Sequence, residues 1–289
     1  MKFLLKLIQT HRRVRQGGTR YSALVVVMLF GFFLEAYMHN FNLVYITLFF
    51  VFAIAYVAGP LGLYNIGELE AKFAPRGRLF ANTKGELYFA ITNNSKTPAW
   101  AISLHVNTLS SEVGRIEGKE TKEAPITITL PKRGEAKEDE CYLQSFFPLS
   151  TVRFVLPIEG GYDTLVYPQP QGIPLRSFLQ KQAMHFGEEK DFDGLAPYSG
   201  AEPLSRIHWP SVAKGETSVK TFAHEQTTQE LAFNFMDAGT NDEERLSQLC
   251  LWVLECEKSH QPFTIEMPNR FIQSKKESID AILEYFARY

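Results

Sequence analysis

Hydrophobic residues are concentrated in the first quarter of the chain, where they form two long runs. The first run covers residues 21–34 without a charge and extends to residue 38, although Glu35 interrupts it. The second run, residues 43–63, is uncharged throughout, which at about 1.5 Å per residue is enough to cross a hydrocarbon core of about 30 Å. Only residues 39–42 separate the two runs. The pattern therefore predicts a transmembrane helical hairpin over residues 21–63.

Basic residues predict the orientation of this hairpin. Six of them precede the first run with no acidic residue among them: Lys2, Lys6, Arg12, Arg13, Arg15 and Arg20. The connection has no Lys or Arg, whereas Lys72, Arg76 and Arg78 follow the second run. Because cytoplasmic flanks carry the excess of Lys and Arg, both ends of the hairpin are expected in the cytoplasm. The chain is therefore expected to be a multi-pass protein of the inner (plasma) membrane with its soluble domains in the cytoplasm. Residues 2–15 are also expected to form a basic amphipathic strip on the anionic inner leaflet.

The same region has two alternative interpretations. A cleaved signal peptide also has a basic start and a short apolar run, but no small-x-small cleavage site follows the first run and a second full span comes at once. Glu35 could mark a polar function inside the bilayer. Its place near the end of the span favours simple solvation at the interface.

Short alternating runs replace the long apolar ones from residue 68 onward and predict β-strands. The expected strands are residues 68–74, 86–92, 100–106, 126–130, 141–146, 151–156 and 164–167. About seven short strands in a hundred residues favour an immunoglobulin-like β-sandwich.

The C-terminal part has a different pattern. Residues 169–190 are rich in Pro, Gln, Gly and charge and are expected to be a linker with little core. Strands are predicted at 230–236 and 262–267 and helices at 242–256 and 275–289, the first helix being capped by Asn241 or Asp242. This β-α-β-α order predicts a small, mostly parallel layer, and the whole chain is assigned to the α+β class. The expected divisions are a basic N-terminus (1–20), the hairpin (21–63), the sandwich (64–168), a linker with a signature segment (169–229) and the small α/β domain (230–289).

Composition adds two constraints. A net charge of −2 gives no indication of nucleic-acid binding. The three cysteines, Cys141, Cys250 and Cys256, have no CxxC pairing and no histidine at ligand spacing, so they are expected to be reduced, buried thiols in a reducing compartment.

A signature segment lies between the linker residues 169–190 and the small α/β domain at 230–289. Its motifs are FDGLAPY at 192–198, SRIHW at 205–209, AK at 213–214 and VKTFAHE at 219–225. In order and spacing these motifs resemble the signature of the family called domain of unknown function 58, and so do the Phe147-Pro148-Leu149 element, residues 165–168 and the leading hairpin. There are departures: Ala201, Glu202, Ser205 and Lys214 stand where the family usually has Gly, Asp, Arg and Arg.

The signature segment supplies the candidate interaction residues, which are Tyr198, Glu202, Arg206, His208, Trp209, Lys214 and Glu225. Glu202 and Arg206 have the spacing of an ion pair on a helical turn, and the aromatic residues offer large faces with a polar edge. The cluster could bind a partner or ligand, or it could be a clasp that fixes the linker onto the last domain. A metal site using His208, His224 and either Glu225 or Asp237 has no supporting motif.

The resemblance also implies a relation to von Willebrand factor A domains, whose Asp-x-Ser-x-Ser loop binds a divalent metal. Here the corresponding residues are Asp237-Ala238-Gly239-Thr240-Asn241, without the two serines, and the chain stops after two β-α units. The metal function is therefore expected to be lost, and this truncated layer is expected to serve packing or docking.

These observations predict a membrane-anchored, non-catalytic scaffold without a cofactor. The family resemblance implies two protein partners, a MoxR-type AAA+ ATPase and a transglutaminase-like membrane protein. The alternatives are a metal-dependent binding module of the von Willebrand A type and an enzyme. No P-loop, Gly-x-Ser-x-Gly, dinucleotide fingerprint or Cys-His arrangement supports the enzyme.

Overall fold

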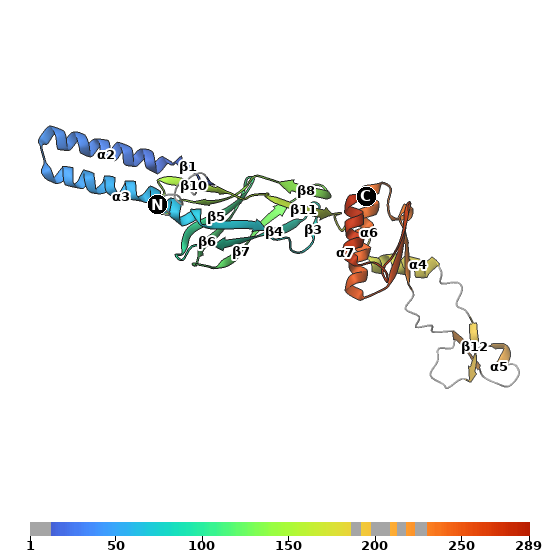
Figure 1. The fold of residues 1–289 in the computed structure, drawn as a ribbon. Coiled ribbons are helices and arrows are strands. Elements are labelled where there is room, and N and C mark those ends of the chain that lie inside the picture. Colours follow the sequence, from blue (N-terminus) through green and yellow to red (C-terminus); the bar gives the residue numbers. More distant parts are fainter. Residues whose placement is uncertain (1–12, 186–191, 198–208, 213–217, 223–229) are drawn as a thin grey trace. The chain divides into compact units, whose positions relative to one another are not determined.

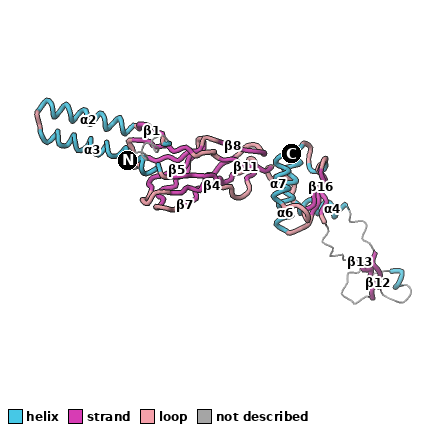
Figure 2. Tube along the Cα trace, in the orientation of Figure 1, coloured by secondary structure: helices cyan, strands magenta, loops and turns pink. Residues whose placement is uncertain are grey.

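The computed structural model describes residues 13–185, 192–197, 209–212, 218–222 and 230–289. It has mixed α+β architecture with two apolar N-terminal helices and several β-sheets (Figures 1 and 2). The chain divides into two compact units, Met1–Tyr167 with Ala287–Tyr289, and Pro168–Phe286. Each unit is described separately below.

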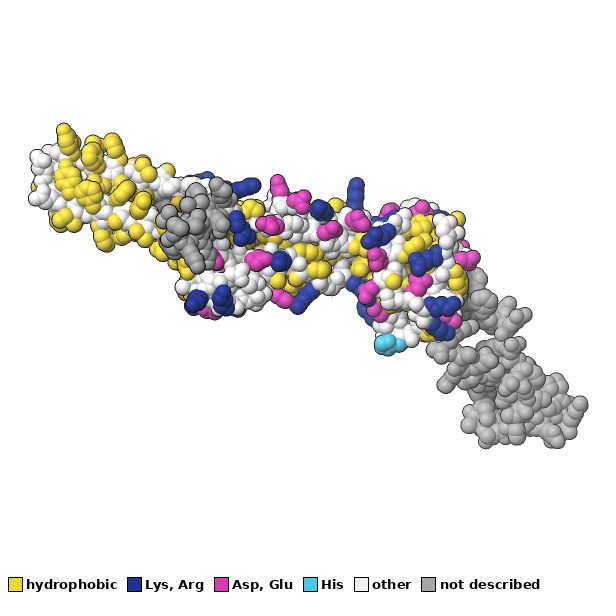
Figure 3. All heavy atoms as spheres, viewed as in Figure 1, with side chains coloured by type: hydrophobic (Ala, Val, Ile, Leu, Met, Phe, Trp, Pro, Cys, Tyr) yellow, Lys and Arg dark blue, Asp and Glu magenta, His cyan; other side chains and the backbone are white. Residues whose placement is uncertain are grey.

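The two apolar runs form helices α2 (Arg20–His39) and α3 (Asn42–Gly67), as predicted. Asn40, in the left-handed conformation at φ 52°, ends α2. The small side chains of Ala36 and Ala58 are buried, whereas most of the large apolar side chains of both helices are exposed. Figure 3 shows this as a hydrophobic surface along the hairpin. Both helices are long and apolar enough to cross a membrane.

Two antiparallel sheets enclose the core of the first unit. One sheet has the order β2-β4-β7, and the other has the order β1-β10-β9-β5-β6. The strands of the first sheet are β2 (Leu69–Phe73), β4 (Lys84–Asn93) and β7 (Thr121–Thr129). Those of the second are β1 (Arg15–Gly18), β5 (Ala99–Val106), β6 (Leu109–Ile116), β9 (Cys141–Ser145) and β10 (Val152–Pro157). Alternate residues of β4 and β5, such as Phe89 and Leu104, are fully buried and belong to one hydrophobic cluster.

A third sheet has the order β3-β11-β8. Its strands are β3 (Leu79–Phe80), β8 (Gly134–Glu138) and β11 (Tyr162–Tyr167). All seven predicted strands are present, with ends that differ by a few residues. Strands β1, β3, β6 and β8 were not predicted. They are either very short or rich in Gly and charged residues, so they have no clear apolar alternation.

The second unit contains a small mixed sheet with the order β14-β15-β16. Its elements are β14 (Leu231–Asn234), η2 (Met236–Ala238), α6 (Asp242–Ser259), β15 (Phe263–Met267), β16 (Arg270–Gln273) and α7 (Ile279–Arg288). The predicted β-α-β-α elements are present, and Asn241 caps α6 by accepting a hydrogen bond from the Glu244 amide. The sheet is not mostly parallel, because the unpredicted β16 pairs antiparallel with β15.

Residues 169–190 differ from the predicted linker, because they contain helix α4 (Leu175–His185) and a packed segment before it. Gln248 exchanges two hydrogen bonds with the backbone of Ile173, at 2.7 and 2.8 Å, and Trp252 Nε1 donates to the Ile173 carbonyl at 2.8 Å. The Phe178 ring lies 4.5 Å from that of Trp252. This segment therefore contributes to the core of the second unit despite its polar composition.

Candidate functional site

The β-sheets of the first unit hold the base of the hairpin, which is the end where α2 begins and α3 ends. The last turn of α3 is buried in the β-sheets, with Asn65 7% exposed and Ile66 fully buried. The Asn65 amide donates to the Trp100 carbonyl at 2.9 Å and to Ser145 Oγ at 3.1 Å, while its Oδ1 accepts from the Trp100 amide at 2.8 Å. Ser145 Oγ also donates to the Trp100 carbonyl. Because all the polar atoms of Asn65 are used, the helix end is fixed to β5 and β9.

Gly62 brings α3 into direct contact with β10 and the segment before it. A Cβ atom at this position would lie 2.1 Å from Cε2 of Phe154 and 2.8 Å from the Phe147 carbonyl oxygen. Both distances are far below van der Waals contact, so only glycine allows this approach. The Phe154 ring, 1% exposed, closes the core beneath the helix.

The start of α2 is attached to the same part of the sheet. Thr19 Oγ1 donates to the Ser150 carbonyl at 2.6 Å, and the Thr19 amide donates to the Thr151 carbonyl at 3.2 Å. Strand β1, immediately before Thr19, pairs antiparallel with β10. Both helices of the hairpin are thus held by residues 145–156, and the β-sheets cannot swing freely about the helix ends.

Glu35 lies one turn before the connection between the helices. Its carboxylate Oε1 is 3.7 Å from His39 Nε2, and both side chains are about half exposed. This places the charge of the first run at the end of the hairpin that is remote from the β-sheets.

A pair of catalytic residue types that the sequence analysis did not single out lies on β5. Ser103 Oγ is 3.1 Å from His105 Nε2, and the His105 ring stacks on Tyr142 with 4.9 Å between centroids. Burial and the nearby Arg153 charge lower the pKa of His105. Catalysis by such a pair ordinarily needs a carboxylate to orient the histidine, and the charged neighbour here is a cation.

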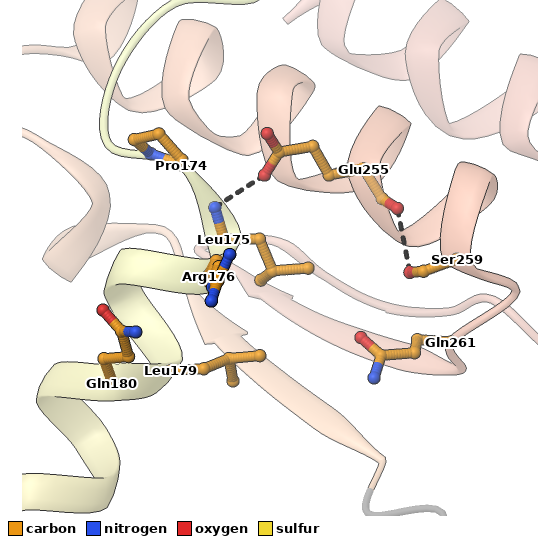
Figure 4. Close-up of a pocket in the computed structure, with 8 residues that line it drawn as sticks. All are labelled: Pro174, Leu175, Arg176, Leu179, Gln180, Glu255, Ser259 and Gln261. Atoms are coloured by element: carbon orange, nitrogen blue, oxygen red, sulfur yellow. Dashed lines mark hydrogen bonds between the residues drawn. The ribbon is translucent and has the colours of Figure 1, made fainter.

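The second unit has an open groove of about 520 Å³ between α4 and the end of α6 (Figure 4). Pro174, Leu175 and Leu179 give it an apolar wall. The Glu255 carboxylate accepts a 2.6 Å hydrogen bond from the Leu175 amide and so caps the start of α4. Among the described residues that line the groove, Glu255 is the acid, and its carboxylate already has a structural partner.

The loop after β14 is where the resemblance to von Willebrand A domains would place a metal. Thr240 Oγ1 bonds to the Glu244 carboxylate, and Asn241 Oδ1 accepts from the Glu244 amide at 2.8 Å. The side-chain oxygens of Thr240 and Asn241 are therefore used in hydrogen bonds at the start of α6 and are not arranged with Asp237 around a metal position. Within the described residues there is no group of three His, Cys, Asp or Glu side chains arranged for a metal ion.

Most of the predicted interaction residues lie outside the described residues: Tyr198, Glu202, Arg206, His208, Lys214 and Glu225. Trp209 is described; it begins the short helix α5 (Trp209–Val212) and is 64% exposed. The two ends of the signature segment form strands β12 (Phe192–Pro197) and β13 (Ser218–Phe222), which pair antiparallel. The choice between a clasp and a binding cluster stays a prediction.

The three cysteines are free and buried, in agreement with the sequence analysis. Burial raises the pKa of the Cys141 thiol from its ordinary value of 9.0 to about 11, and that of Cys256 to about 12. The Cys250 thiol lies 3.3 Å from the Pro168 carbonyl oxygen. These are packing residues, since a reactive cysteine needs an exposed thiolate.

We therefore expect the thiols to be unreactive in the folded protein. At pH 8 a thiol with a pKa near 11, such as that of Cys141, is ionised to only about one part in a thousand. Because all three thiols are also buried, Ellman's reagent should label none of them within minutes. All three should react once guanidinium unfolds the chain. A Ser110→Cys variant supplies an exposed thiol as the positive control, and rapid labelling of the unmodified chain would contradict the prediction.

The same pKa shifts predict that stability falls at alkaline pH. Above pH 9 the unfolded chain loses thiol protons that the folded chain keeps until about pH 11 for Cys141. The free energy of unfolding is unaffected by this ionisation below pH 9 and falls as the pH rises above it, by up to about 1.4 kcal/mol per pH unit for each of Cys141 and Cys256. Denaturant unfolding at pH 8 and pH 10 measures this loss, which Cys141→Ala should reduce.

Comparison with known proteins adds no relative: no model of a known protein family matches the chain, and no curated protein is significantly similar to it.

Proposed function

We propose that this chain is a membrane-anchored, non-catalytic interaction protein whose hairpin holds the β-rich unit and the C-terminal unit on the cytoplasmic side of an inner membrane. The observation that carries the proposal is the exposed apolar surface of α2 and α3. Only 6% of the most apolar stretch of α2 and 17% of that of α3 is buried. A core helix of a soluble protein would be mostly buried, so lipid is the natural environment of these side chains.

Charge and the junction both support the proposed orientation. The N-terminal flank and the segment after α3 carry the Lys and Arg residues, while the connection at residues 40–41 carries none. Both flanks are attached to the same β-sheets by Thr19 and Asn65. A single soluble unit therefore lies at the basic ends of both helices, in agreement with a cytoplasmic location.

Protease protection and carbonate extraction test the anchor. A tagged full-length chain should stay in the membrane fraction after alkaline carbonate treatment. Residues beyond α3 should be cleaved in inverted vesicles and protected in intact spheroplasts. Release by gentle lysis would overturn the anchor, and cleavage from outside intact spheroplasts would overturn the orientation.

We also propose the finer fold assignments. Two antiparallel sheets that share one hydrophobic cluster support an immunoglobulin-like sandwich. Strands β14 and β15 pair in parallel, and a helix follows β14 and another follows β16, which supports a small von Willebrand A-like layer. Thr240 and Asn241, used for capping, support a docking rather than a metal-binding role for this layer.

The partners follow from the resemblance to the domain of unknown function 58 family. We propose a MoxR-type AAA+ ATPase and a transglutaminase-like membrane protein, with the signature segment and the groove beside α4 as docking surfaces. Chemical crosslinking of the full-length chain in its native membrane, followed by mass spectrometry, tests this. Recovery of the ATPase supports the proposal, and its absence from well-crosslinked samples counts against it.

A further inference from the structure

Three large apolar side chains of the first unit are exposed around the base of the hairpin. Trp100 is 39% exposed, Phe146 37% and Leu149 44%. We call these three residues the apolar rim. They belong to β5 and to the loop between β9 and β10, the segments that hold the two helices.

The distance along α3 places this loop at the depth of the lipid headgroups. Gly62 lies twenty residues after Asn42, the first residue of α3, which is about 30 Å of helix. This equals the hydrocarbon thickness of a typical bilayer. The atoms that Gly62 touches, the Phe147 carbonyl and the Phe154 ring, are therefore at the level where α3 leaves the hydrocarbon.

Helix α2 gives the same level independently. It has 20 residues, about 30 Å, and starts at Arg20. Thr19, directly before it, bonds to the Ser150 carbonyl at 2.6 Å. The loop that carries Phe146 and Leu149 is thus attached to both helices at the bilayer interface.

The side chains of this region suit that environment. Tryptophan is enriched at membrane interfaces, and the Arg115 guanidinium lies 4.3 Å from the Trp100 ring. Arg115 also pairs with Glu117 at 2.8 Å, and Arg153 is exposed on β10. Leu61 and Tyr64 of α3, 47% and 45% exposed, continue the apolar surface of the hairpin toward the rim.

We propose that the apolar rim inserts into the interfacial layer of the bilayer, so that the β-sheets rest on the membrane surface. The rim binds phospholipid. The upper parts of the acyl chains contact Phe146 and Leu149, and the headgroup phosphates lie close enough to interact with Arg115 and Arg153. This inference rests on the proposed membrane anchor and adds a second, peripheral contact to it. The β-rich unit is then held at one height and one tilt rather than free to rotate above the lipid.

Fluorescence quenching by brominated lipids tests the proposal on the full-length chain. The protein is reconstituted at low density into vesicles of phosphatidylcholine and phosphatidylglycerol brominated near the glycerol end or near the methyl end of the acyl chain. The difference in emission between the unmodified chain and Trp100→Phe isolates the Trp100 signal. We expect shallow bromines to remove most of this signal and deep bromines to remove much less.

Two further variants in the Trp100→Phe background locate the contact. Leu149→Trp should gain a component that shallow bromines quench. Leu109→Trp is the matched control, because Leu109 is equally exposed (38%) but lies at the other end of β6 from the rim. The rim end of β6 is Ile116, which pairs with Ala99 beside Trp100 and is seven residues from Leu109. Its emission should not change.

Flotation of the same vesicles separates the possible outcomes. If the chain floats but neither Trp100 nor Leu149→Trp is quenched, the rim proposal is overturned and the anchor stands. If the chain does not float, the anchor fails and the rim proposal fails with it. Trp100 emission that changes with protein density but that no bromine position quenches would assign the rim to a second copy of the chain and overturn the lipid contact.

Discussion

Substituting Gly62 by alanine is expected to destabilise the first unit by about 2–3 kcal/mol, because the added methyl group has no space. It would lie 2.1 Å from one carbon of the Phe154 ring, 2.3 Å from another and 2.8 Å from the Phe147 carbonyl oxygen. The ring cannot move aside, since Phe154 is 1% exposed inside the core. Helix α3 must therefore shift away from β10, which also strains the hydrogen bonds of Asn65. The melting temperature of purified chain in nanodiscs measures the effect and should fall by several degrees.

Gly31→Ala is the matched control, because a Cβ atom at Gly31 meets nothing within 4 Å. Gly31 lies inside α2 with no proline after it and has the same change in intrinsic helix propensity, so its substitution should leave the melting temperature unchanged or raise it slightly. A second test is the pair Gly62→Ala with Phe154→Leu. The smaller leucine side chain should accommodate the methyl group, so the double variant should lose less stability than the sum of the losses of the two single variants. Equal melting temperatures for Gly62→Ala and Gly31→Ala would refute the close approach.

The sequence predicts the hairpin well because its signal is long and strong. Apolar runs of about twenty residues with at most one charge have few alternative structures, and both become helices at nearly the predicted positions. The seven predicted strands were also found because their apolar and polar residues alternate clearly. Strand β1 lies in a Gly-Gly segment with no apolar alternation and forms only because its backbone pairs with β10. Pairing of that kind depends on tertiary contacts that a local pattern does not contain.

The junction shows a different limit of sequence analysis. Gly62 and Asn65 fall at the end of an apolar run, where the sequence marks only the limit of a span. Their importance comes from contacts with Phe154, Trp100 and Ser145, which are distant in the chain. An amide side chain directly after such a run is a weak signal that the helix continues into a folded domain.

Residues 169–190 illustrate the opposite error. Their Pro, Gln and Gly content is typical of a linker, yet Ile173 is fixed by Gln248 and Trp252. The donors that order this segment belong to α6, about 75 residues later. The interaction residues of the signature segment could be proposed from motif order alone, and the described residues locate one of them, Trp209.

Asn65→Ala is expected to weaken the junction by about 2–3 kcal/mol through lost hydrogen bonds rather than through crowding. The amide of Asn65 makes bonds of 2.8 and 2.9 Å with the backbone of Trp100 and one of 3.1 Å with Ser145 Oγ. Alanine would leave the Trp100 amide without this partner in a site that is only 7% exposed at Asn65. The melting temperature should fall, and protease cleavage near residues 64–68 should become faster because the helix end is no longer fixed.

Asn94→Ala is the matched control, since Asn94 is exposed and its amide contacts Glu70 only at 3.5 Å. Ser145→Ala should also weaken the junction, because it removes the hydroxyl that binds the Asn65 amide, the Trp100 carbonyl and the Phe147 amide, although both bonds between Asn65 and Trp100 stay in place. If the junction sets the position of the β-sheets on the lipid, Asn65→Ala should also reduce the quenching of Trp100 by shallow bromines while the chain still floats with the vesicles. Unchanged stability and unchanged quenching together would mean that the amide does not couple the hairpin to the β-rich unit.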